Sequence, residues 1–484
     1  MAARPATGPA TAMVAAGSGP HVTAISKATK GEPFVSEAPR LGFVGGFDGM
    51  RGIGVVIVLL GHIFPEGTDS FNPIVDVFFV ISAFLIVSLL MQERRQNGRI
   101  DLRRFYTRRA FRLLPNSYAC MAAWMLVYGL VKLSGVKLNA DGLEQVNAIP
   151  GNVAAAATYT YHLVYPIGGK PGPLVQFWSL SLEEQFYLAI GFAAVAVLAV
   201  RRRVWVVSTV LVALVVWIGW SCWRVDLGPW PGREYHLDFW TRGLRLLWMA
   251  RPDALLIGVL LAIGNAKLPD PLSPRAKRII TWSGTIGAVV CGLVLMSSLE
   301  ILHKRGFGFW VPGVPRDASQ IKNVNGEMWC ALEKGAVHRP CTDEMWMFRW
   351  GFSLMGLAIA PVTLCFARCK DAAVSRFFSL RWFRKVGEMS YSLYVWHLFA
   401  FVLVAIVTDG MGQGPSAILK LAAAFGISYL AHRYIDRAVL GMKLRFSSEN
   451  VVLDRRTGQE VESKDFTGKR PDPRHRPWTS ELER

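Results

Sequence analysis

The segment FDGMRGIGVVIVLLGH, residues 47–62, places three ionisable side chains in an otherwise apolar stretch. Arg51 and His62 are eleven residues apart, close to three helical turns, so a helix carries both on one face about 16 Å apart. Asp48 precedes Arg51 by three residues and can pair with it. The imidazole is a candidate general base and the arginine a candidate anion-binding group. A structural ion pair beside a hydrogen-bonded histidine is the alternative.

A second apolar segment, FWSLSLEEQFYL at 177–188, carries two acids near its start. Glu183 and Tyr187 are one turn apart on the same helical face, and Glu184 points elsewhere. A carboxylate here could orient a histidine or activate a hydroxyl substrate, or it could be an interfacial acid that snorkels. In RPDALLIG, residues 251–258, Arg251 and Asp253 are better explained as an ion pair that anchors a helix end.

The stretch RRQNGRIDLRRFYTRRAFR, residues 94–112, contains eight arginines with aromatic residues between them. Such a stretch binds anionic lipid headgroups or a phosphate-rich ligand. No nucleic-acid module accompanies it, so we expect no nucleic-acid partner. Neither a GxSxG elbow, a Walker A loop, an HExxH motif nor a metal-ligand cluster is present, and the HxxxD pattern of His432 and Asp436 is attributed to chance.

The composition indicates which elements position these groups. Of 484 residues, 52% are hydrophobic and only 18% charged, and much of the apolar sequence falls in runs near 20 residues. This excludes an ordinary cytosolic enzyme and predicts an all-α, polytopic membrane bundle in the cell (plasma or inner) membrane. Basic residues exceed acidic ones by 54 to 35, a net charge of +19, which in a membrane protein is expected in cytoplasmic loops.

We expect ten spans, at 43–64, 74–91, 113–133, 177–200, 204–222, 247–265, 280–299, 348–367, 388–407 and 415–434. Basic clusters follow the second, fourth, sixth and eighth spans, so all of them lie on one side. The positive-inside rule makes that side cytoplasmic and places both termini there. The 300–346 loop then lies outside. Residues 152–166 are semi-apolar and are interpreted as a re-entrant or interfacial helix on the outer side.

Three regions lie apart from the spans. Residues 1–40 are rich in Ala, Gly, Pro, Ser and Thr and are expected to form a disordered arm, and 437–484 a polar cytoplasmic tail, so that the transmembrane domain covers 41–436. Cys330 and Cys341 both lie in the long outer loop. If that loop faces an oxidising compartment, they could form a disulfide.

These motifs together resemble the acyltransferase 3 family of O-acetylase-like integral membrane acyltransferases. The family's LDGLRGIA…H motif corresponds to FDGMRGIGVVIVLLGH, and GVDLFFVLSGFLI to IVDVFFVISAFLI with Asp76 and Ser82. FYxRRxxRLxPxY corresponds to FYTRRAFRLLPNSY, with Tyr118 displaced by one position, and Ala83 replaces the usual glycine. WSLSLEEQFY, RPDALLIGVLLA and VGEMSYSLYVWH follow in the family's order.

The resemblance implies transfer of an acyl group, commonly acetyl, from a cytosolic acyl-CoA to a hydroxyl of a glycan, glycolipid or other acceptor. Acyl-CoA is then a co-substrate, and neither a bound cofactor nor a metal is expected. His62 is predicted to act as general base or transient acyl carrier, with Glu183 and Asp48 assisting. Arg51, Arg108, Arg109 and Arg112 would hold the donor. The supporting residues are Asp76, Ser82, Trp178, Tyr187, Arg251 and Asp253.

Other functions fit parts of the pattern. Charged residues inside spans also suit a transporter or flippase for a lipid-linked sugar or small anion, although a transporter has no evident need for the Arg51–His62 spacing together with the RRxxR loop. The acceptor could instead be a hydrophobic small molecule such as a macrolide. A non-catalytic scaffold is the weakest alternative, because the candidate catalytic residues are present.

Overall fold

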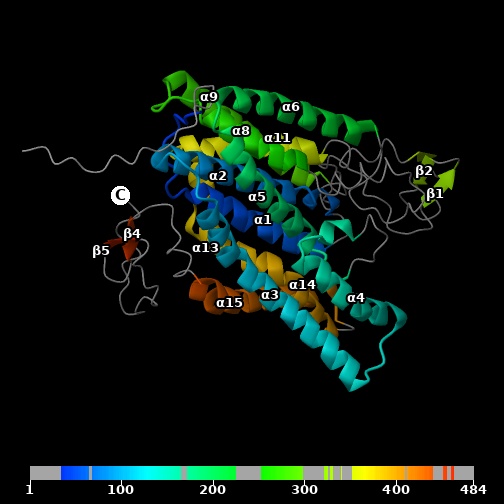
Figure 1. The fold of residues 1–484 in the computed structure, drawn as a ribbon. Coiled ribbons are helices and arrows are strands. Elements are labelled where there is room, and N and C mark those ends of the chain that lie inside the picture. The colour runs from blue at the N-terminus through cyan, green and yellow to red at the C-terminus, as the bar shows by residue number, and fades with distance from the viewer. Residues whose placement is uncertain are drawn as a thin grey trace, which may run out of the picture.

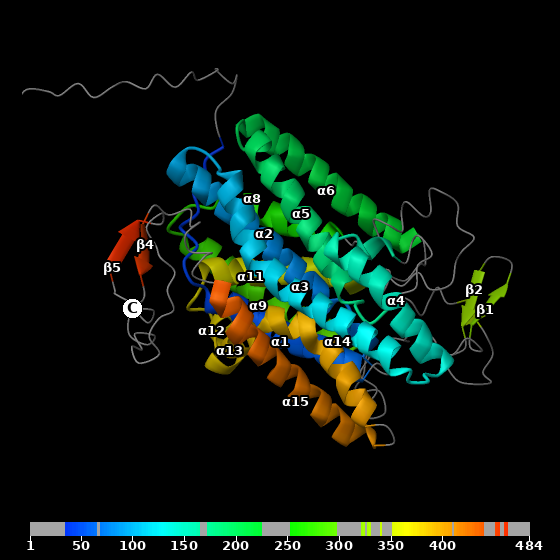
Figure 2. The ribbon, with the colours of Figure 1, turned by 60° about the horizontal axis from the view of Figure 1, so that its bottom comes forward.

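The computed structural model describes residues 34–64, 68–164, 172–224, 252–297, 351–408 and 411–439, together with the backbone of five short strands outside these ranges. The described ranges form an all-α bundle whose long helices run roughly side by side (Figure 1). The three-stranded sheet of the long loop and the strand pair of the tail lie beyond opposite ends of this bundle (Figures 1 and 2).

Eight of the described helices are long and apolar enough to cross a membrane. They are α1 (Gly45–Ile63), α2 (Ile74–Asn97), α3 (Leu102–Ser134), α5 (Phe177–Val197), α6 (Arg201–Arg224), α9 (Pro274–Met296), α14 (Ser390–Val407) and α15 (Gln413–Ala431). Two shorter apolar helices, α8 (Pro252–Asn265) and α11 (Phe352–Arg368), occupy the predicted sixth and eighth spans. At 1.5 Å per residue α8 covers only about 21 Å of a ~30 Å hydrocarbon core. The count of ten and the cytoplasmic termini therefore stay predictions.

The remaining elements are short or lie at the ends of the bundle. The helical ones are η1 (Asp69–Phe71), α4 (Ala140–Ala157), η2 (Tyr161–Leu163), α12 (Ala373–Phe378), α13 (Arg381–Glu388) and the π-helical turn η6 (His432–Asp436). The strands are β1 (Ile321–Val324), β2 (Glu327–Cys330), β3 (Arg339–Pro340), β4 (Val451–Asp454) and β5 (Gln459–Glu462), all paired antiparallel.

Helix α2 lies at the centre of the main hydrophobic core. Its sequence is apolar on all sides, as expected for a helix surrounded by others. It packs against α1, α5, α8 and α11. By contrast, α6 leaves most of its surface exposed, which fits a helix at the bundle's lipid-facing edge.

Helices α1 and α13 pack with their backbones in contact. A Cβ added to Gly49 would lie 1.6 Å from the carbonyl oxygen of Phe378, in the preceding helix α12, and one added to Gly387 would lie 1.8 Å from that of Asp48. No side chain fits at either position, so glycine is what allows α12 and α13 to approach α1. This approach fixes the position of the helix that carries Arg51 and His62.

Two predicted regions differ from expectation. Residues 34–40, assigned to the disordered arm, are ordered and packed: Phe34 is buried, and Glu37 N–H donates to Ala266 O over 2.7 Å. Residues 34–40 therefore belong to the packed part of the protein. In the 152–166 region, α4 starts twelve residues earlier, at Ala140, and ends at Ala157. It is not among the candidate spans, and its place in a membrane stays a prediction.

Several predictions fall on residues outside the described ranges. These include Arg251, Cys341 and therefore the Cys330–Cys341 disulfide, most of the 300–346 loop, residues 1–33 and most of the 437–484 tail.

Candidate functional site

Helix α1 carries Asp48, Arg51 and His62 into the bundle between α2, α13 and α14. Because the helix is continuous from Gly45 to Ile63, Arg51 and His62 keep the predicted separation of about 16 Å along one face. The side chains around α1 accordingly form two groups, one around Arg51 and one around His62.

The group around Arg51 joins arginines of α3 to an acid of α5. Arg109 stacks on the Tyr187 ring, with Cζ 4.5 Å from the ring centroid, and the Tyr187 hydroxyl donates a hydrogen bond to Glu183. Tyr187 is only 3% exposed, so the stack is buried. Arg51 and Arg112 lie within electrostatic range of it. Three of the four arginines predicted to hold the donor therefore converge.

Two further acids lie in this group. Asp48 is within electrostatic range of Arg51 and Arg112, but among the described residues the predicted direct Asp48–Arg51 ion pair is not formed. Glu184, which the helical spacing directed elsewhere, interacts with Arg109 and Arg112, because long arginine side chains of α3 reach across that face. Three arginines are thus matched by three acids.

The fourth predicted arginine, Arg108, contacts an acid of α2. Arg108 Nη2 pairs with Glu93 Oε2 at 3.2 Å, and Glu93, only 4% exposed, also accepts a hydrogen bond from Asp101 N–H. Asp101 in turn caps the start of α3 by accepting from Arg104 N–H. The structure therefore places Arg108 in a contact that joins α2 to α3.

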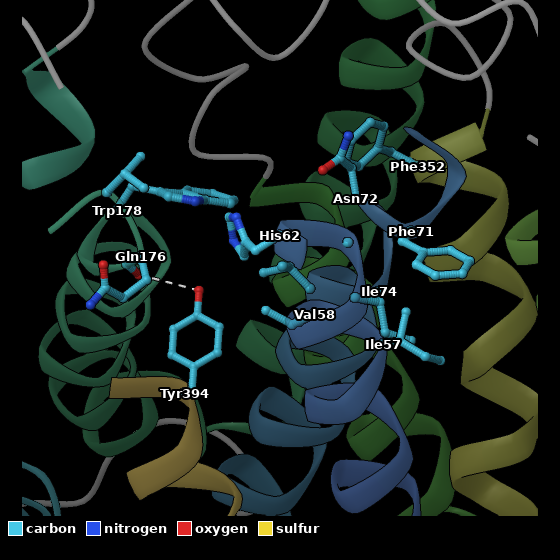
Figure 3. A pocket seen from close by; sticks show the side chains of 13 residues that line it. Ile57, Val58, His62, Phe71, Asn72, Ile74, Gln176, Trp178, Phe352 and Tyr394 are labelled. Atoms are coloured by element: carbon cyan, nitrogen blue, oxygen red, sulfur yellow. Dashed lines mark hydrogen bonds between the residues drawn. The ribbon is translucent and has the colours of Figure 1, made fainter. Parts of the chain in front are cut away.

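His62 faces a pocket between α1, η1, α2, α5 and α14 (Figure 3). Apolar side chains of α1 and α2 form much of its wall, Asn72 and Gln176 add amide groups, and Trp178 lies beside the imidazole. The Trp178 indole is held edge-on against Phe79, with ring centroids 6.2 Å apart. The pocket is open at its mouth, so a substrate group can enter it from outside and reach the imidazole.

A second histidine, not singled out from the sequence, lies directly behind His62. The rings of His62 and His397 have centroids 5.1 Å apart and are tilted by 38°. His397 is fully buried in α14, and its Nδ1 lies 2.8 Å from the carbonyl oxygen of Tyr394. The available signal was the motif VGEMSYSLYVWH, which ends in His397.

Tyr394 connects the His62 pocket to the Arg51 group. It lines the pocket, its hydroxyl contacts the Ser179 hydroxyl, and it donates to Gln176 O over 3.2 Å (Figure 3). It is also within electrostatic range of Glu183. Glu183 therefore reaches Tyr187, Tyr394 and the arginines, and its predicted contact with His62 is not among the interactions of the described residues.

The other predicted supporting residues lie at separate places. Ser82 lies beside the Tyr187 phenol. Asp76 is buried in the first turn of α2, where the helix dipole favours an acid. Asp253 is buried in α8 and accepts from Ser353 Oγ over 2.9 Å, so it joins α8 to α11. Within the described residues, no three His, Cys, Asp or Glu side chains converge as metal ligands do.

The two residues of the HxxxD pattern, His432 and Asp436, contact each other and belong to a network that connects helices. His432 Nδ1 lies 3.0 Å from Asp436 Oδ2, and Asp436 accepts from Ser392 and from Asn116. Asn116 is fully buried and accepts from the Trp396 indole N–H over 2.6 Å. The network ties α3, α14 and η6 together and does not include His62 or His397.

Comparison with known proteins adds a family to this geometry. A family model described as an acyltransferase domain matches residues 44–433. Peptidoglycan O-acetyltransferase OatA of Listeria monocytogenes is 25% identical over 415 residues, which is 82% of this chain and 56% of that protein. A putative peptidoglycan O-acetyltransferase of Bacillus subtilis is 22% identical, covering 85% and 57%.

O-acetyltransferase OatA of Staphylococcus aureus is likewise 22% identical, over 83% of this chain and 58% of that protein. The chain thus spans little more than half the length of these curated relatives. No solved structure matches it significantly.

Proposed function

Because the chain belongs to the acyltransferase 3 family, whose domain covers residues 44–433, we propose that it moves an acetyl group from a cytosolic acyl-CoA to a hydroxyl of a cell-envelope glycan. The observation that carries this proposal is the pairing on one helix: Arg51 among arginines at one end of α1 and His62 in a pocket at the other.

The Arg51 group suits the phosphates of the donor. Guanidinium groups bind phosphate oxygens through two parallel hydrogen bonds. Asp48, Glu183 and Glu184 lie within electrostatic range of the arginines of this group. The adjoining arginines of residues 94–104, of which Arg99 and Arg103 are exposed, add further positive charge. We infer that the donor's polyanionic end binds here and that its thiol arm extends along α1, past Tyr394, toward His62.

The transfer itself needs one base. A ring nitrogen of His62 takes the proton of the acceptor hydroxyl as the hydroxyl oxygen attacks the thioester carbonyl carbon. The new ester C–O bond forms, the C–S bond breaks, and the proton passes from His62 to the departing CoA thiolate. The products are the acylated acceptor and CoA, and the imidazole returns to its starting state.

The acceptor class follows from the pocket and from the relatives. Trp178 offers an aromatic face and Asn72 offers an amide, a combination that suits a sugar ring with its hydroxyls. The relatives are named for peptidoglycan O-acetylation. On these grounds we place the protein in the plasma membrane, with a glycan such as peptidoglycan as acceptor.

The test uses the full chain in proteoliposomes with radiolabelled acetyl-CoA and soluble peptidoglycan fragments. We expect glycan-dependent CoA release and label transfer, both falling by about 10²–10⁴-fold in His62→Ala. His162→Ala, which changes a buried histidine of η2 away from the pocket, is the matched control and should retain activity. Near-normal turnover of His62→Ala, or label that crosses the membrane without being transferred, would contradict the proposal.

A further inference from the structure

The buried histidine His397 has one ring nitrogen with a partner and one without. Nδ1 lies 2.8 Å from the Tyr394 carbonyl oxygen. A carbonyl oxygen can only accept, so Nδ1 carries the hydrogen. In the neutral ring Nε2 is then a bare acceptor, and this atom is buried without a hydrogen-bond partner among the described residues. Such orphaned acceptors are uncommon in folded proteins and call for a donor.

Among the rings of the described residues, one can supply that donor. The rings around His397 are those of His62, Tyr394 and Phe401, with centroids 5.1, 5.8 and 5.6 Å away. Phe401 has no polar hydrogen, and the Tyr394 hydroxyl already bonds Ser179 and Gln176 O. The imidazole N–H of His62 is therefore the remaining hydrogen-bond donor for His397 Nε2.

The separation of the two histidines permits this bond. A five-membered ring with bonds of ~1.35 Å places each nitrogen about 1.1 Å from the ring centre. Centres 5.1 Å apart therefore leave about 2.9 Å between facing nitrogens, a normal hydrogen-bond length. Rotation of the His62 ring, which faces the open pocket, brings the two nitrogens into line.

We propose that His397 is a positioning residue for His62: its Nε2 accepts the N–H of one His62 nitrogen and so directs the lone pair of the other toward the acceptor hydroxyl. This rests on the proposed function, in which His62 is the base. During transfer the hydroxyl proton goes to His62 and then to the CoA thiolate, and His397 keeps its own proton on Nδ1 throughout. The histidine occupies the place that a carboxylate has in a Ser-His-Asp triad. A neutral acceptor suits a membrane interior, where a buried carboxylate would be costly.

Two substitutions separate this role from packing. In His397→Gln the side-chain amide reaches the position of Nε2 and keeps an acceptor facing His62. In His397→Asn the amide reaches only Nδ1, so it keeps the bond to the Tyr394 carbonyl and loses the acceptor. The readout is kcat and KM for acetyl-CoA, by CoA release in proteoliposomes with peptidoglycan fragments. Thermal melting of each variant in detergent monitors the fold, and His162→Asn is the control for loss of a buried imidazole.

We expect His397→Asn to lower kcat by about 100-fold, within the range of a misplaced general base, with KM for acetyl-CoA changed less than about threefold. His397→Gln should recover most of that loss, and adding His397→Asn to His62→Ala should cost nothing further. Wild-type kcat in His397→Asn, with His62→Ala inactive, would overturn the role of His397 and leave the proposed function standing. Equal loss in folded Asn and Gln variants would also overturn it, and an active His62→Ala would instead overturn the proposed function.

Discussion

The backbone contact between α1 and the α12–α13 segment gives a graded test of the fold around the site. Four glycines of α1 differ in what an added Cβ would meet: backbone oxygen at 1.6 Å for Gly49 and 2.2 Å for Gly52, the Phe366 ring at 2.8 Å for Gly46, and only ordinary contact at 3.5 Å for Gly61. Replacing each by alanine adds the same methyl group to the same helix. The differences in stability therefore report mainly the contacts, and Gly49 and Gly52, both in the helix interior, form the matched pair.

The magnitudes follow from the distances. Alanine in a helix interior is favoured over glycine by about 1 kcal/mol, a gain that applies to Gly49 and Gly52 and is smaller for Gly46 and Gly61 near the ends of α1. To restore an ordinary contact, Gly49→Ala must move α12 away by about 1.8 Å, and a gap of only 0.5–1 Å already forfeits a quarter to a half of the dispersion energy at an interface. Overpacking costs about 1–3 kcal/mol even where neighbours can yield, and backbone yields least. We expect net losses of about 2 kcal/mol or more for Gly49→Ala and about 1–2 kcal/mol for Gly52→Ala.

The Gly46 variant should lose less, because a phenylalanine ring can shift, and Gly61→Ala should be neutral or slightly stabilising. Detergent-solubilised variants are compared by the denaturant or temperature at which half of the protein unfolds. If Gly49→Ala is as stable as Gly61→Ala, α12 does not lie against α1 and the placement of the site is wrong.

Two further contacts give sharp predictions. Glu93→Gln should destabilise the protein by about 2 kcal/mol, because it leaves the guanidinium of Arg108 without its carboxylate in a mostly buried place. The same substitution should change KM for acetyl-CoA little. A large rise in KM at unchanged stability would return Arg108 to the donor site. Asn116→Ala should cost about 2–4 kcal/mol, since it leaves the Trp396 indole N–H without its partner and opens a cavity. His432, a partly buried member of the same network, should tolerate alanine better. Equal melting points for the two variants would show that the network does not hold α3 to α14.

The sequence was sufficient for the residues that share one helix. Arg51 and His62 were identified because ionisable groups in an apolar span are costly, and helical spacing alone aligns them. The same reasoning located Glu183 and Tyr187 on α5, whereas Trp178 came from the family motif WSLSLEEQFY. For these residues local geometry carries the information, and the structure keeps it.

Contacts between helices were predicted less well. The family motif grouped Arg108 with Arg109 and Arg112, and it did not reveal that Arg108 pairs with Glu93 of α2. Glu184 was left out of the site because it lies on another face of its helix than Glu183 and Tyr187, although long side chains from α3 reach that face. Residues 34–40 look disordered by composition, yet burial of Phe34 and backbone hydrogen bonds to the ends of α5 and α8 hold them. Each of these contacts joins different elements of the fold.

The missed histidine shows how a motif can be explained by contacts that spacing does not reveal. Residues 386–397 include the end of α13, Met389 and the first two turns of α14, so they form one nearly continuous segment. At one end Gly387 lets the backbone meet that of α1 at Asp48, and at the other end His397 meets His62. The motif therefore contacts α1 beside both groups of the site, the arginines near Asp48 and the pocket at His62. On the proposed mechanism the donor's charged end and its thioester must be held at a fixed separation. A single rigid helix, held near both groups by a single neighbouring segment, provides that separation without relying on loops.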